Sequence, residues 1–405
     1  MALEVQANNT IPPQSIIVAF YANPNYGSDW RVGSEYIKFA ADYGFELAII
    51  ATLDRNAKDS DLIPVDVPMR VLRVPWFWNN SAFLYKLSDF LPQIFWHFRV
   101  MKTIKKKYGK VNCIWISTSS AQPWFPLSGY IKLADQVVWG PVGGGGYPSK
   151  TVFSCLNFRT KAREIFRSVV EKSMFIRKVK LIKSQQEKDI VILTRTRQVQ
   201  ERLKKALGRP DIPLFPEFLH ILSSSIHLVN GTKKLRFLWV GRDIPRKNLE
   251  LALAVFRKLR DEYFPEAQLD IYGCSKSSSE KGVIYYGWVS KIDWALYTGR
   301  GVLLLSSYRE GLSTVLIEAI SNGLLCIATP VGAIPSFKLP NVLLLDQADY
   351  TALSSGCIKN LAIGIENFLK QEIIELPEVT FVQELEDYLQ SKNVLSIKRN
   401  SEKIN

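Results

Sequence analysis

The sequence predicts an α/β protein built from two domains, each with a mostly parallel sheet covered by helices. Its 405 residues are enough for two domains of about 150 residues or more. Hydrophobic residues make up 47% and charged residues 22% of the chain, a balance that is typical of a globular protein. An apolar strand followed by a glycine-containing loop and a helix occurs in both halves of the chain, as in doubly wound folds.

The first domain is predicted to begin with a βαβ unit. The run at 15–20 is apolar and rich in β-branched residues, with prolines on both sides, as expected of a buried strand. Gly44 follows a helical pattern at the position where glycine commonly ends a helix. The predicted elements are a strand at 15–20, a glycine-containing loop at 25–33, a helix at 34–43, and strands at 45–52, 111–116, 136–139 and 190–194.

The second domain repeats this order after a break in regular structure. Pro213, Pro216 and the serines at 223–225 predict a linker. The elements that follow are a strand at 235–240, a helix at 248–263, strands at 268–272, 284–286 and 301–306, a helix at 313–321 and a strand at 325–329. The predicted division is a first domain at 1–220, a linker at 221–232, a second domain at 233–370, and a helical tail at 371–405 that packs back on the first domain.

Composition argues against several other classes of protein. No stretch approaches the roughly 18 apolar residues that span a bilayer, and residues 1–13 lack the basic and apolar regions of a signal peptide. Five scattered cysteines without a CxxC pair, and only three histidines, argue against a zinc site and a disulfide framework. The Asp59-Ser-Asp61 triplet lies in a polar segment and fits a solvated turn better than a metal site. We therefore expect a cytoplasmic protein with no metal and no other cofactor.

The strongest chemical signal is a strand-to-helix turn in the second domain. The segment 306–323 passes from the end of a strand through a turn at 310–311 into a helix that begins at 313 or 314. Free amides in the turn and the positive end of the helix dipole predict an anion site suited to a phosphate. Glu318, eight residues after Glu310, can accept hydrogen bonds from a diol. The simpler interpretation is a helix start with solvated glutamates.

A second loop favours the binding site over that simpler interpretation. The strand at 235–240 ends at Gly241, and a basic loop leads from it into the next helix. Arg242 and Lys247 of this loop can both reach a diphosphate, the arginine as a fork and the lysine as a point charge. A basic loop alone would be a weak signal, since exposed basic loops are common, but its spacing to Glu310 and Glu318 strengthens it considerably.

These two segments together resemble the retaining glycosyltransferases of family 4. The shared patterns are Val-Gly-Arg-x4-Lys-Asn at 240–248 and Glu-Gly-x6-Glu-Ala-x3-Gly at 310–323. The resemblance covers 235–335, with a weaker likeness at 16–53 and in the glycine-rich turn at 140–146. It implies the GT-B fold, in which two Rossmann-like domains face each other across a cleft.

The resemblance also implies roles for individual residues. The implied catalytic residues, which stabilise the leaving diphosphate or hold the sugar, are Arg242, Lys247 and Glu310. The implied donor-binding residues are Gly27, Gly33, Gly241, Gly311, Leu312, Ser313, Thr314, Val315 and Glu318. The implied cleft-lining residues are Gly143, Gly144, Ser119 and Gln122. Family members often carry a histidine near the reacting sugar. The comparable stretch of this chain, 116–123, has none, and we expect its serines or Gln122 to contact the sugar instead.

The net charge of +14 is concentrated in one segment. Between Lys150 and Arg209 the chain has 17 Lys and Arg against 5 Asp and Glu. Aromatic residues crowd 75–98, and a lysine-rich stretch follows at 102–110. Both features suggest an anionic membrane surface as a partner. The alternative is a core of aromatic residues beside a solvated basic face. No nucleic-acid-binding motif accompanies the charge, so we expect no nucleic acid as a partner.

The expected function is that of a hexosyltransferase that retains the anomeric configuration of its donor sugar. It would move the sugar from a nucleoside-diphosphate sugar to a glycan or lipid-linked acceptor in polysaccharide or glycolipid biosynthesis. We expect the protein in the cytoplasm, peripherally attached at the inner face of the membrane. The alternatives are a catalytically silent GT-B protein that binds a glycan or a protein partner, a nucleic-acid-binding protein, and a sugar-nucleotide epimerase.

Overall fold

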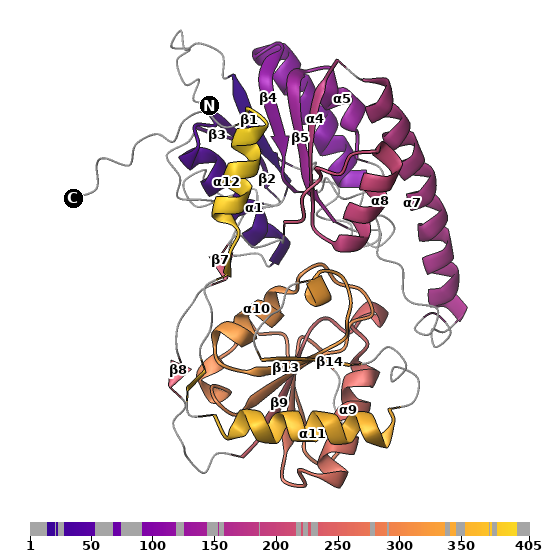
Figure 1. Ribbon diagram of the computed structural model, residues 1–405, viewed down its shortest axis with the longest axis vertical. Helices are drawn as coiled ribbons and strands as arrows, with labels where there is room; N and C mark the ends of the chain where they lie inside the picture. The colour runs from indigo at the N-terminus through magenta and orange to yellow at the C-terminus, as the bar shows by residue number, and fades with distance from the viewer. Residues whose placement is uncertain are drawn as a thin grey trace, which may run out of the picture.

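A computed structural model of the chain contains two α/β domains, drawn one above the other in Figure 1. The residues that the structure describes are 14–20, 22, 28–52, 68–73, 91–118, 125–143, 153, 158–185, 187–215, 220–221, 226–227, 234–275, 280–289, 291–336, 341–345, 353–371, 373–374 and 379–394. The statements below concern these residues.

The first domain contains a parallel sheet of six strands in the order β3-β2-β1-β4-β5-β6. The chain therefore starts in the middle of the sheet and winds outward in both directions. Ile16 and Val18 of the first strand are buried on one face and Ile17 on the other, because helices cover both faces. The strands are β1 (Ser15–Ala19), β2 (Leu47–Thr52), β3 (Met69–Arg73), β4 (Val111–Ile116), β5 (Ala134–Val142) and β6 (Asp189–Thr194).

Helices of the first domain form two layers on this sheet. One layer shares a hydrophobic core with Ile16 and Val18 and consists of α4 (Leu91–Lys107), α5 (Leu127–Ile131), α7 (Phe158–Ser184) and α8 (Arg197–Leu207). The opposite face is covered by α1 (Ser28–Asp42), whose Tyr36 and Ile37 are fully buried beside Trp115 of β4.

The second domain repeats the architecture with the strand order β11-β10-β9-β12-β13-β14. Its strands are β9 (Arg236–Val240), β10 (Gln268–Tyr272), β11 (Val283–Gly287), β12 (Gly301–Leu305), β13 (Leu325–Ala328) and β14 (Val342–Leu344). Its α-helices are α9 (Leu249–Glu262), α10 (Thr314–Ser321) and α11 (Ser355–Leu369). The predicted fold class, two Rossmann-like domains with parallel sheets, is confirmed.

The prediction for the start of the first helix was wrong. α1 begins at Ser28, six residues before the predicted start at Ser34. Gly33, which the prediction places in a loop, therefore lies in the second turn of the helix and is buried. A glycine in a helix interior costs about 1 kcal/mol relative to alanine, so the local pattern favours a later start. Burial of the apolar side of α1 against the sheet outweighs that cost.

Two chain segments connect the domains, and they pair with each other. β7 (His220–Ile221) pairs with β16 (Val379–Thr380), and β8 (Ile226–His227) pairs with β15 (Ile373–Ile374), both antiparallel. The segment predicted as an irregular linker therefore contains short strands.

After this return crossing, α12 (Val382–Ser391) packs on the first domain beside α1 (Figure 1). The hydroxyl of Tyr43, the residue that follows α1, donates a hydrogen bond to Glu386. Gln136 of β5 donates to the backbone oxygen of Lys392 at 2.8 Å, and the Lys392 ammonium lies 2.8 Å from an oxygen of Asp211. The end of the described chain is thus attached to the domain in which the chain begins.

Candidate active site

The candidate site lies where two neighbouring strands of the second sheet end. β9 and β12 pair in parallel, so the loops that follow them emerge at the same edge of the sheet. The loop after β9 passes through Gly241 and Arg242 into a short 3-10 helix, η3 (Pro245–Lys247), and then into α9. The loop after β12 leads into α10.

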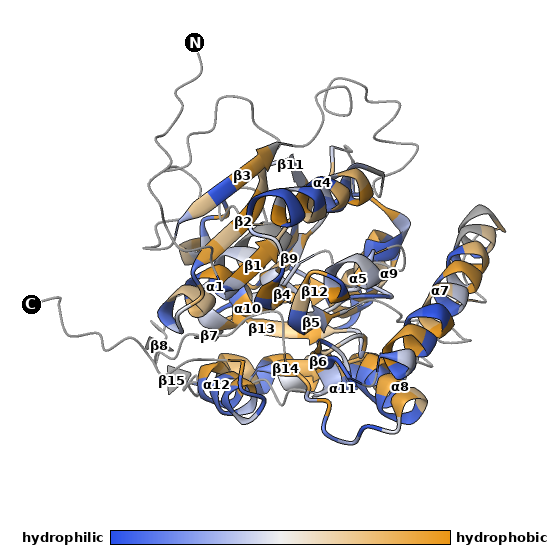
Figure 2. Cartoon of the chain, turned by 90° about the horizontal axis from the view of Figure 1, so that it is seen from above, coloured by the Kyte–Doolittle hydropathy of each residue, from blue (hydrophilic) through white to orange (hydrophobic). Residues whose placement is uncertain are grey.

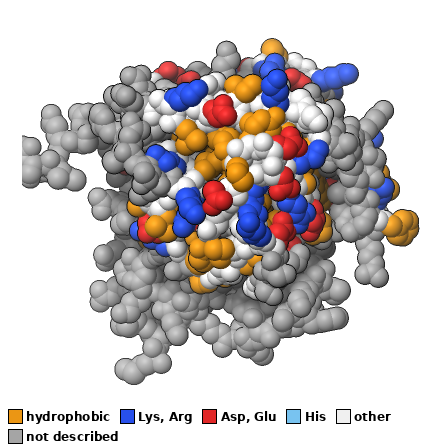
Figure 3. Space-filling model, turned by 90° about the horizontal axis from the view of Figure 1, so that it is seen from below, with side chains coloured by type: hydrophobic (Ala, Val, Ile, Leu, Met, Phe, Trp, Pro, Cys, Tyr) orange, Lys and Arg blue, Asp and Glu red, His pale blue; other side chains and the backbone are white. Residues whose placement is uncertain are grey.

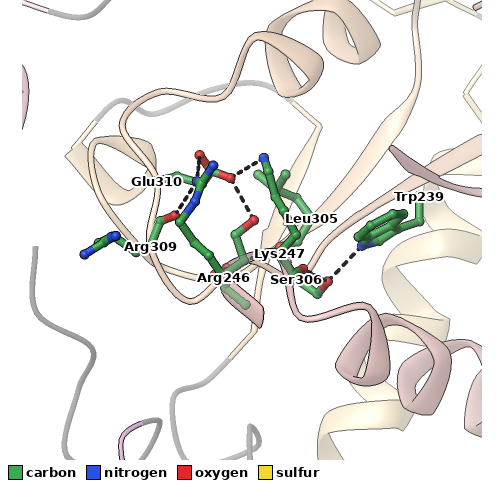
Figure 4. Close-up of polar contacts among 9 residues, drawn as sticks. Trp239, Arg246, Lys247, Leu305, Ser306, Arg309 and Glu310 are labelled. Atoms are coloured by element: carbon green, nitrogen blue, oxygen red, sulfur yellow. Dashed lines mark hydrogen bonds and ion pairs between the residues drawn. The ribbon is translucent and has the colours of Figure 1, made fainter. Parts of the chain in front are cut away.

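Ser306 joins these two loops (Figure 4). Its hydroxyl donates a hydrogen bond of 2.9 Å to the backbone oxygen of Lys247 and accepts one of 3.1 Å from the indole nitrogen of Trp239. Next to it, the Tyr308 amide donates to the backbone oxygen of Arg246 at 3.1 Å. These bonds fix η3 against the strand end, so the basic side chains of η3 face the turn at Glu310.

The Glu310 side chain is only 9% exposed and lies between two cations from the other loop (Figure 4). Its Oε1 lies 2.5 Å from the Lys247 ammonium and its Oε2 lies 2.9 Å from the Arg246 guanidinium. The Ser307 hydroxyl donates to Oε1 at 2.7 Å. Burial alone would raise the pKa of Glu310, but the charges of Lys247 and Arg246 hold it below its usual value. The carboxylate is therefore ionised, and the three side chains together carry one net positive charge.

Gly332 allows a second loop to support this turn. Its φ is +63°, and a Cβ built on it would lie 2.0 Å from the backbone oxygen of Glu310. The neighbouring Ala333 amide donates to the backbone oxygen of Gly311 at 3.1 Å. Only glycine fits this close approach, so the loop after β13 packs directly against the turn and supports it.

The start of α10 has donors that no side chain of the described residues satisfies. Its N-cap, Ser313, makes no side-chain capping hydrogen bond. The hydroxyl oxygen of Thr314, the first helical residue, is buried and has no hydrogen-bond partner among the described residues. First-turn amides of a helix lack intrahelical partners, and the positive end of the dipole adds to their attraction for anions. This arrangement beside Lys247 and Arg246 can bind a phosphate.

All the predicted site residues of the second domain lie at this edge of the sheet. Arg242 is exposed directly after Gly241, and Glu318 is half-buried about one turn into α10, eight residues after Glu310. The described residues of this group, all on the loops after β9 and β12 or on α10, are Gly241, Arg242, Lys247, Glu310, Gly311, Leu312, Ser313, Thr314, Val315 and Glu318. Their roles in donor binding stay predictions.

Predicted residues of the first domain are less well defined. Gly33 lies inside α1, and Gly143 follows β5, where a Cβ would come within 2.8 Å of the Arg195 side chain. Gly27, Gly144, Ser119 and Gln122 lie outside the described residues.

Sequence reasoning missed three charged residues around the site. Arg246 binds Glu310 beside Lys247, although only Lys247 of this basic pair is named by the sequence pattern. Arg309 of the same turn lies 3.4 Å from Glu164 of α7 in the first domain. Glu164 is buried and also pairs with Arg167 at 2.9 Å. The Arg309–Glu164 pair therefore connects the turn to the opposite domain.

His97 shows no feature of a catalytic group. It is buried in α4 and shares a hydrogen bond of 2.7 Å with the Tyr130 hydroxyl. Burial, together with the nearby charge of Lys178, lowers the pKa of His97 to about 3. The imidazole is therefore neutral at neutral pH, and His97 is a packed residue of α4.

Within the described parts of the chain, no cluster of three or more His, Cys, Asp or Glu side chains is arranged to hold a metal ion. Among the same residues, no helix combines the length and apolar character needed to span a membrane.

Comparison with known proteins agrees with this geometry. Residues 225–372 match the family model described as Glycosyl transferases group 1. This stretch contains both loops of the candidate site. No curated protein sequence matches the chain.

Solved structures resemble the chain over nearly its whole length. The chain is similar to sucrose-phosphate synthase from Thermosynechococcus elongatus, with a TM-score of 0.58, 16% identity, and coverage of 93% of this chain and 98% of that one. It is also similar to WaaG, a glycosyltransferase involved in lipopolysaccharide biosynthesis, with a TM-score of 0.52, 12% identity, and coverage of 94% and 99%. The lipopolysaccharide outer core galactosyltransferase WaaB gives a TM-score of 0.52 at 17% identity, with coverage of 93% and 99%.

At these identities the likeness concerns the fold, and it identifies the architecture as GT-B. The second domain of the chain in addition carries the sequence pattern of the Glycosyl transferases group 1.

Proposed function

We propose that the chain is a retaining glycosyltransferase of family 4 that uses a nucleoside-diphosphate sugar. The observation that carries this proposal is the Lys247–Glu310–Arg246 cluster beside the start of α10. The match to the Glycosyl transferases group 1 covers both parts of it. A net positive cluster next to free helix amides suits the diphosphate of such a donor.

The proposed chemistry breaks the bond between the anomeric carbon and the diphosphate oxygen and forms a bond to an acceptor hydroxyl oxygen. The diphosphate leaves with the bonding electron pair and develops negative charge as the bond breaks, and its leaving oxygen takes up the proton that the acceptor hydroxyl loses. Lys247, Arg246 and the exposed Arg242 are positioned to stabilise that charge as it develops, which lowers the barrier directly. We assign no protein nucleophile, and the reaction as proposed needs no metal.

Other donor contacts follow from the same loops. We propose that the Glu318 carboxylate accepts hydrogen bonds from the ribose hydroxyls and that the amides of Thr314 and Val315 bind phosphate. The Gly311, Leu312 and Ser313 amides and Glu310 hold the sugar hydroxyls. Glu310 has a second task in this proposal, since its oxygens already accept from Lys247, Arg246 and Ser307 and so position both cations. A carboxylate has lone pairs for about four donors, which leaves capacity for a sugar hydroxyl.

The acceptor in this proposal is a glycan or a lipid-linked molecule of polysaccharide or glycolipid biosynthesis. The protein would then work in the cytoplasm, peripherally bound to the inner face of the membrane. The basic segment between Lys150 and Arg209 supports the membrane contact, because it attracts anionic lipid.

Calorimetric titration with UDP, GDP and ADP tests the donor site. We expect one nucleotide to bind the wild type and to bind Glu318→Ala at least about tenfold more weakly, as expected when a charged hydrogen-bond acceptor is lost. Glu262→Ala, which removes an exposed carboxylate of α9, is the matched control and should bind as the wild type does. Failure of all three nucleotides to bind the wild type would contradict the donor site. It would favour a catalytically silent GT-B protein.

A further inference from the structure

The outer face of α7 is unusually apolar for a solvent-facing helix. Phe158 is 84% exposed and Phe166 is 72% exposed, and three further large apolar side chains on the helix are more than half exposed. Those three are Ile165, Val169 and Ile176. Successive helical residues rotate by about 100°, so the positions 158, 165, 169 and 176 fall on one stripe. In both views α7 runs along the periphery of the molecule (Figures 1 and 2).

The second half of α7 presents positive charge on the same exposed side. The exposed basic residues there are Lys172, Arg177, Lys180 and Lys183. The two glutamates of the helix do not neutralise this side. Glu164 and Glu171 both bind Arg167, at 2.9 and 2.5 Å, and have side chains only 6% and 13% exposed. α7 is therefore apolar toward its start and cationic toward its end.

α4 repeats this pattern in the same helical layer. Phe95 and Phe98 are about half exposed near its start, and Arg99, Lys102 and Lys105 are exposed farther along. No acidic residue occurs in α4.

α4 and α7 also lie on the same face of the first sheet, and Phe125 connects them. The His97 ring of α4 lies 5.0 Å from the Phe125 ring, and the Lys178 ammonium of α7 lies 5.6 Å from the same ring. The outward sides of α4 and α7 therefore lie on the same side of the first domain.

We propose that the outward sides of α4 and α7, which we call the α4/α7 surface, dock on an anionic lipid bilayer. Exposed phenylalanine and aliphatic side chains insert at the level of the headgroups, and the lysine and arginine side chains contact the anionic headgroups. A second copy of the chain is a poorer occupant, because two α4/α7 surfaces repel each other through like charges. The face of the molecule seen from below, by contrast, has acidic side chains among its basic and hydrophobic ones (Figure 3).

The biological role of this docking rests on the proposed function, since α7 also contacts the candidate site. Glu164 of α7 lies 3.4 Å from Arg309 in the turn of the candidate site. The apolar half of α7, which contains Glu164, is therefore the half next to the turn. Docking of this half would hold the donor site near the membrane surface, where a lipid-linked acceptor is presented.

Vesicle flotation of the full chain tests the α4/α7 surface. We expect retention on vesicles of phosphatidylcholine mixed with phosphatidylglycerol, a decrease with rising salt, and little retention on phosphatidylcholine alone. The double variant Phe158→Gln/Phe166→Gln should lower the partition coefficient by about tenfold or more. Lys180→Glu/Lys183→Glu should also lower the partition coefficient, and this decrease should grow as the fraction of anionic lipid rises. Leu296→Gln/Ile363→Gln, which removes two exposed apolar side chains of the second domain, should leave it unchanged.

Three results would overturn the docking surface: no retention of the wild type, equal retention of the phenylalanine variant, or a dimer in sedimentation that depends on Phe158 and Phe166. Nucleotide binding by the same preparations separates this proposal from the proposed function. Intact nucleotide binding without vesicle retention contradicts the docking surface alone, whereas vesicle retention without nucleotide binding contradicts the donor site alone.

Discussion

Glu310 illustrates how single residues determine this site. Its carboxylate could be a solvated side chain at a helix start, but it is largely buried and ionised between Lys247 and Arg246. The ion pair with Glu310 holds the Lys247 ammonium in one position, although the lysine side chain itself is flexible. Fixed charge of this kind is what stabilises a developing diphosphate with little reorganisation.

Lys247→Ala should lower kcat by about 10²–10³, the range seen when one charge-stabilising donor is removed. The free energy of unfolding should change much less, because Arg246 and Ser307 still bind Glu310. Steady-state kinetics and urea unfolding of the same preparation measure both quantities. Lys281→Ala, an exposed lysine of the second domain, serves as the control. Wild-type turnover by Lys247→Ala would remove the lysine from the proposed mechanism.

His97 provides a prediction about stability and pH. Its pKa falls from the usual 6.5 to about 3 in the fold, so between these values the unfolded chain binds the proton more tightly. This residue therefore lowers stability as pH falls below 6.5 and has no such effect at pH 7 or above. In His97→Gln, which keeps a partner for the Tyr130 hydroxyl, the loss of stability between pH 7 and pH 4.5 should be smaller by about 2–3 kcal/mol. Urea unfolding at both pH values measures it, and an unchanged pH dependence would contradict the buried neutral imidazole.

At the scale of elements, the site depends on loops held by close backbone contacts. The turn at Glu310 rests on the loop of Gly332, and η3 is tied to β12 through Ser306. These contacts leave the start of α10 and the cations facing the same space.

Gly332→Ala should shift the turn, because a Cβ at φ +63° would lie 2.0 Å from the Glu310 oxygen. We expect nucleotide affinity to fall at least about tenfold, together with a loss of stability of about 1–3 kcal/mol from the strained backbone. Gly208→Ala is a matched control, since Gly208 has φ +69° and nothing within 4 Å of its Cβ position. It carries the same backbone strain without the collision. Equal nucleotide affinity in the two variants would contradict the support of the turn by Gly332.

Elements with continuous apolar runs could be predicted from the sequence, and long-range pairs could not. β9, β10 and β12 were predictable because each is a short run of buried residues followed by a glycine or serine at the sheet edge. The start of α1 was missed because a glycine inside a helix is unfavourable locally. Arg246 pairs with a residue 64 positions away, and Arg309 with one 145 positions away. No local pattern indicates such partners.

For the whole molecule, α12 connects the end of the described chain to the first domain. Leu385 and Leu389 are fully buried, and Tyr388 packs against Phe215 with ring centroids 6.1 Å apart. The paired strands of the two crossing segments bring the chain back to this position. The relative placement of the domains thus depends on the end of the chain as well as on the Arg309–Glu164 pair.

Leu385→Ala should lower the free energy of unfolding by about 2–5 kcal/mol, the usual cost of truncating a buried leucine. Because α12 packs on the first domain, the loss should appear in the unfolding transition of that domain. Hydrogen exchange on the amides of α1 and β5 can locate it. Gln383→Ala, on the same helix but exposed and bonded to Asp387, should cost far less. Equal stability of the two variants would contradict the packing of α12.

The measurement that tests the central claim most directly is consumption of a donor by the wild type. UDP-, GDP- and ADP-sugars are incubated with the protein and a panel of glycan and lipid-linked acceptors, nucleotide release is followed, and the anomeric configuration of the product is determined by NMR. We predict release of one nucleotide and a product with the same configuration as the donor. Release from none of the donors would contradict the assignment as an enzyme, and a product of inverted configuration would contradict the retaining mechanism.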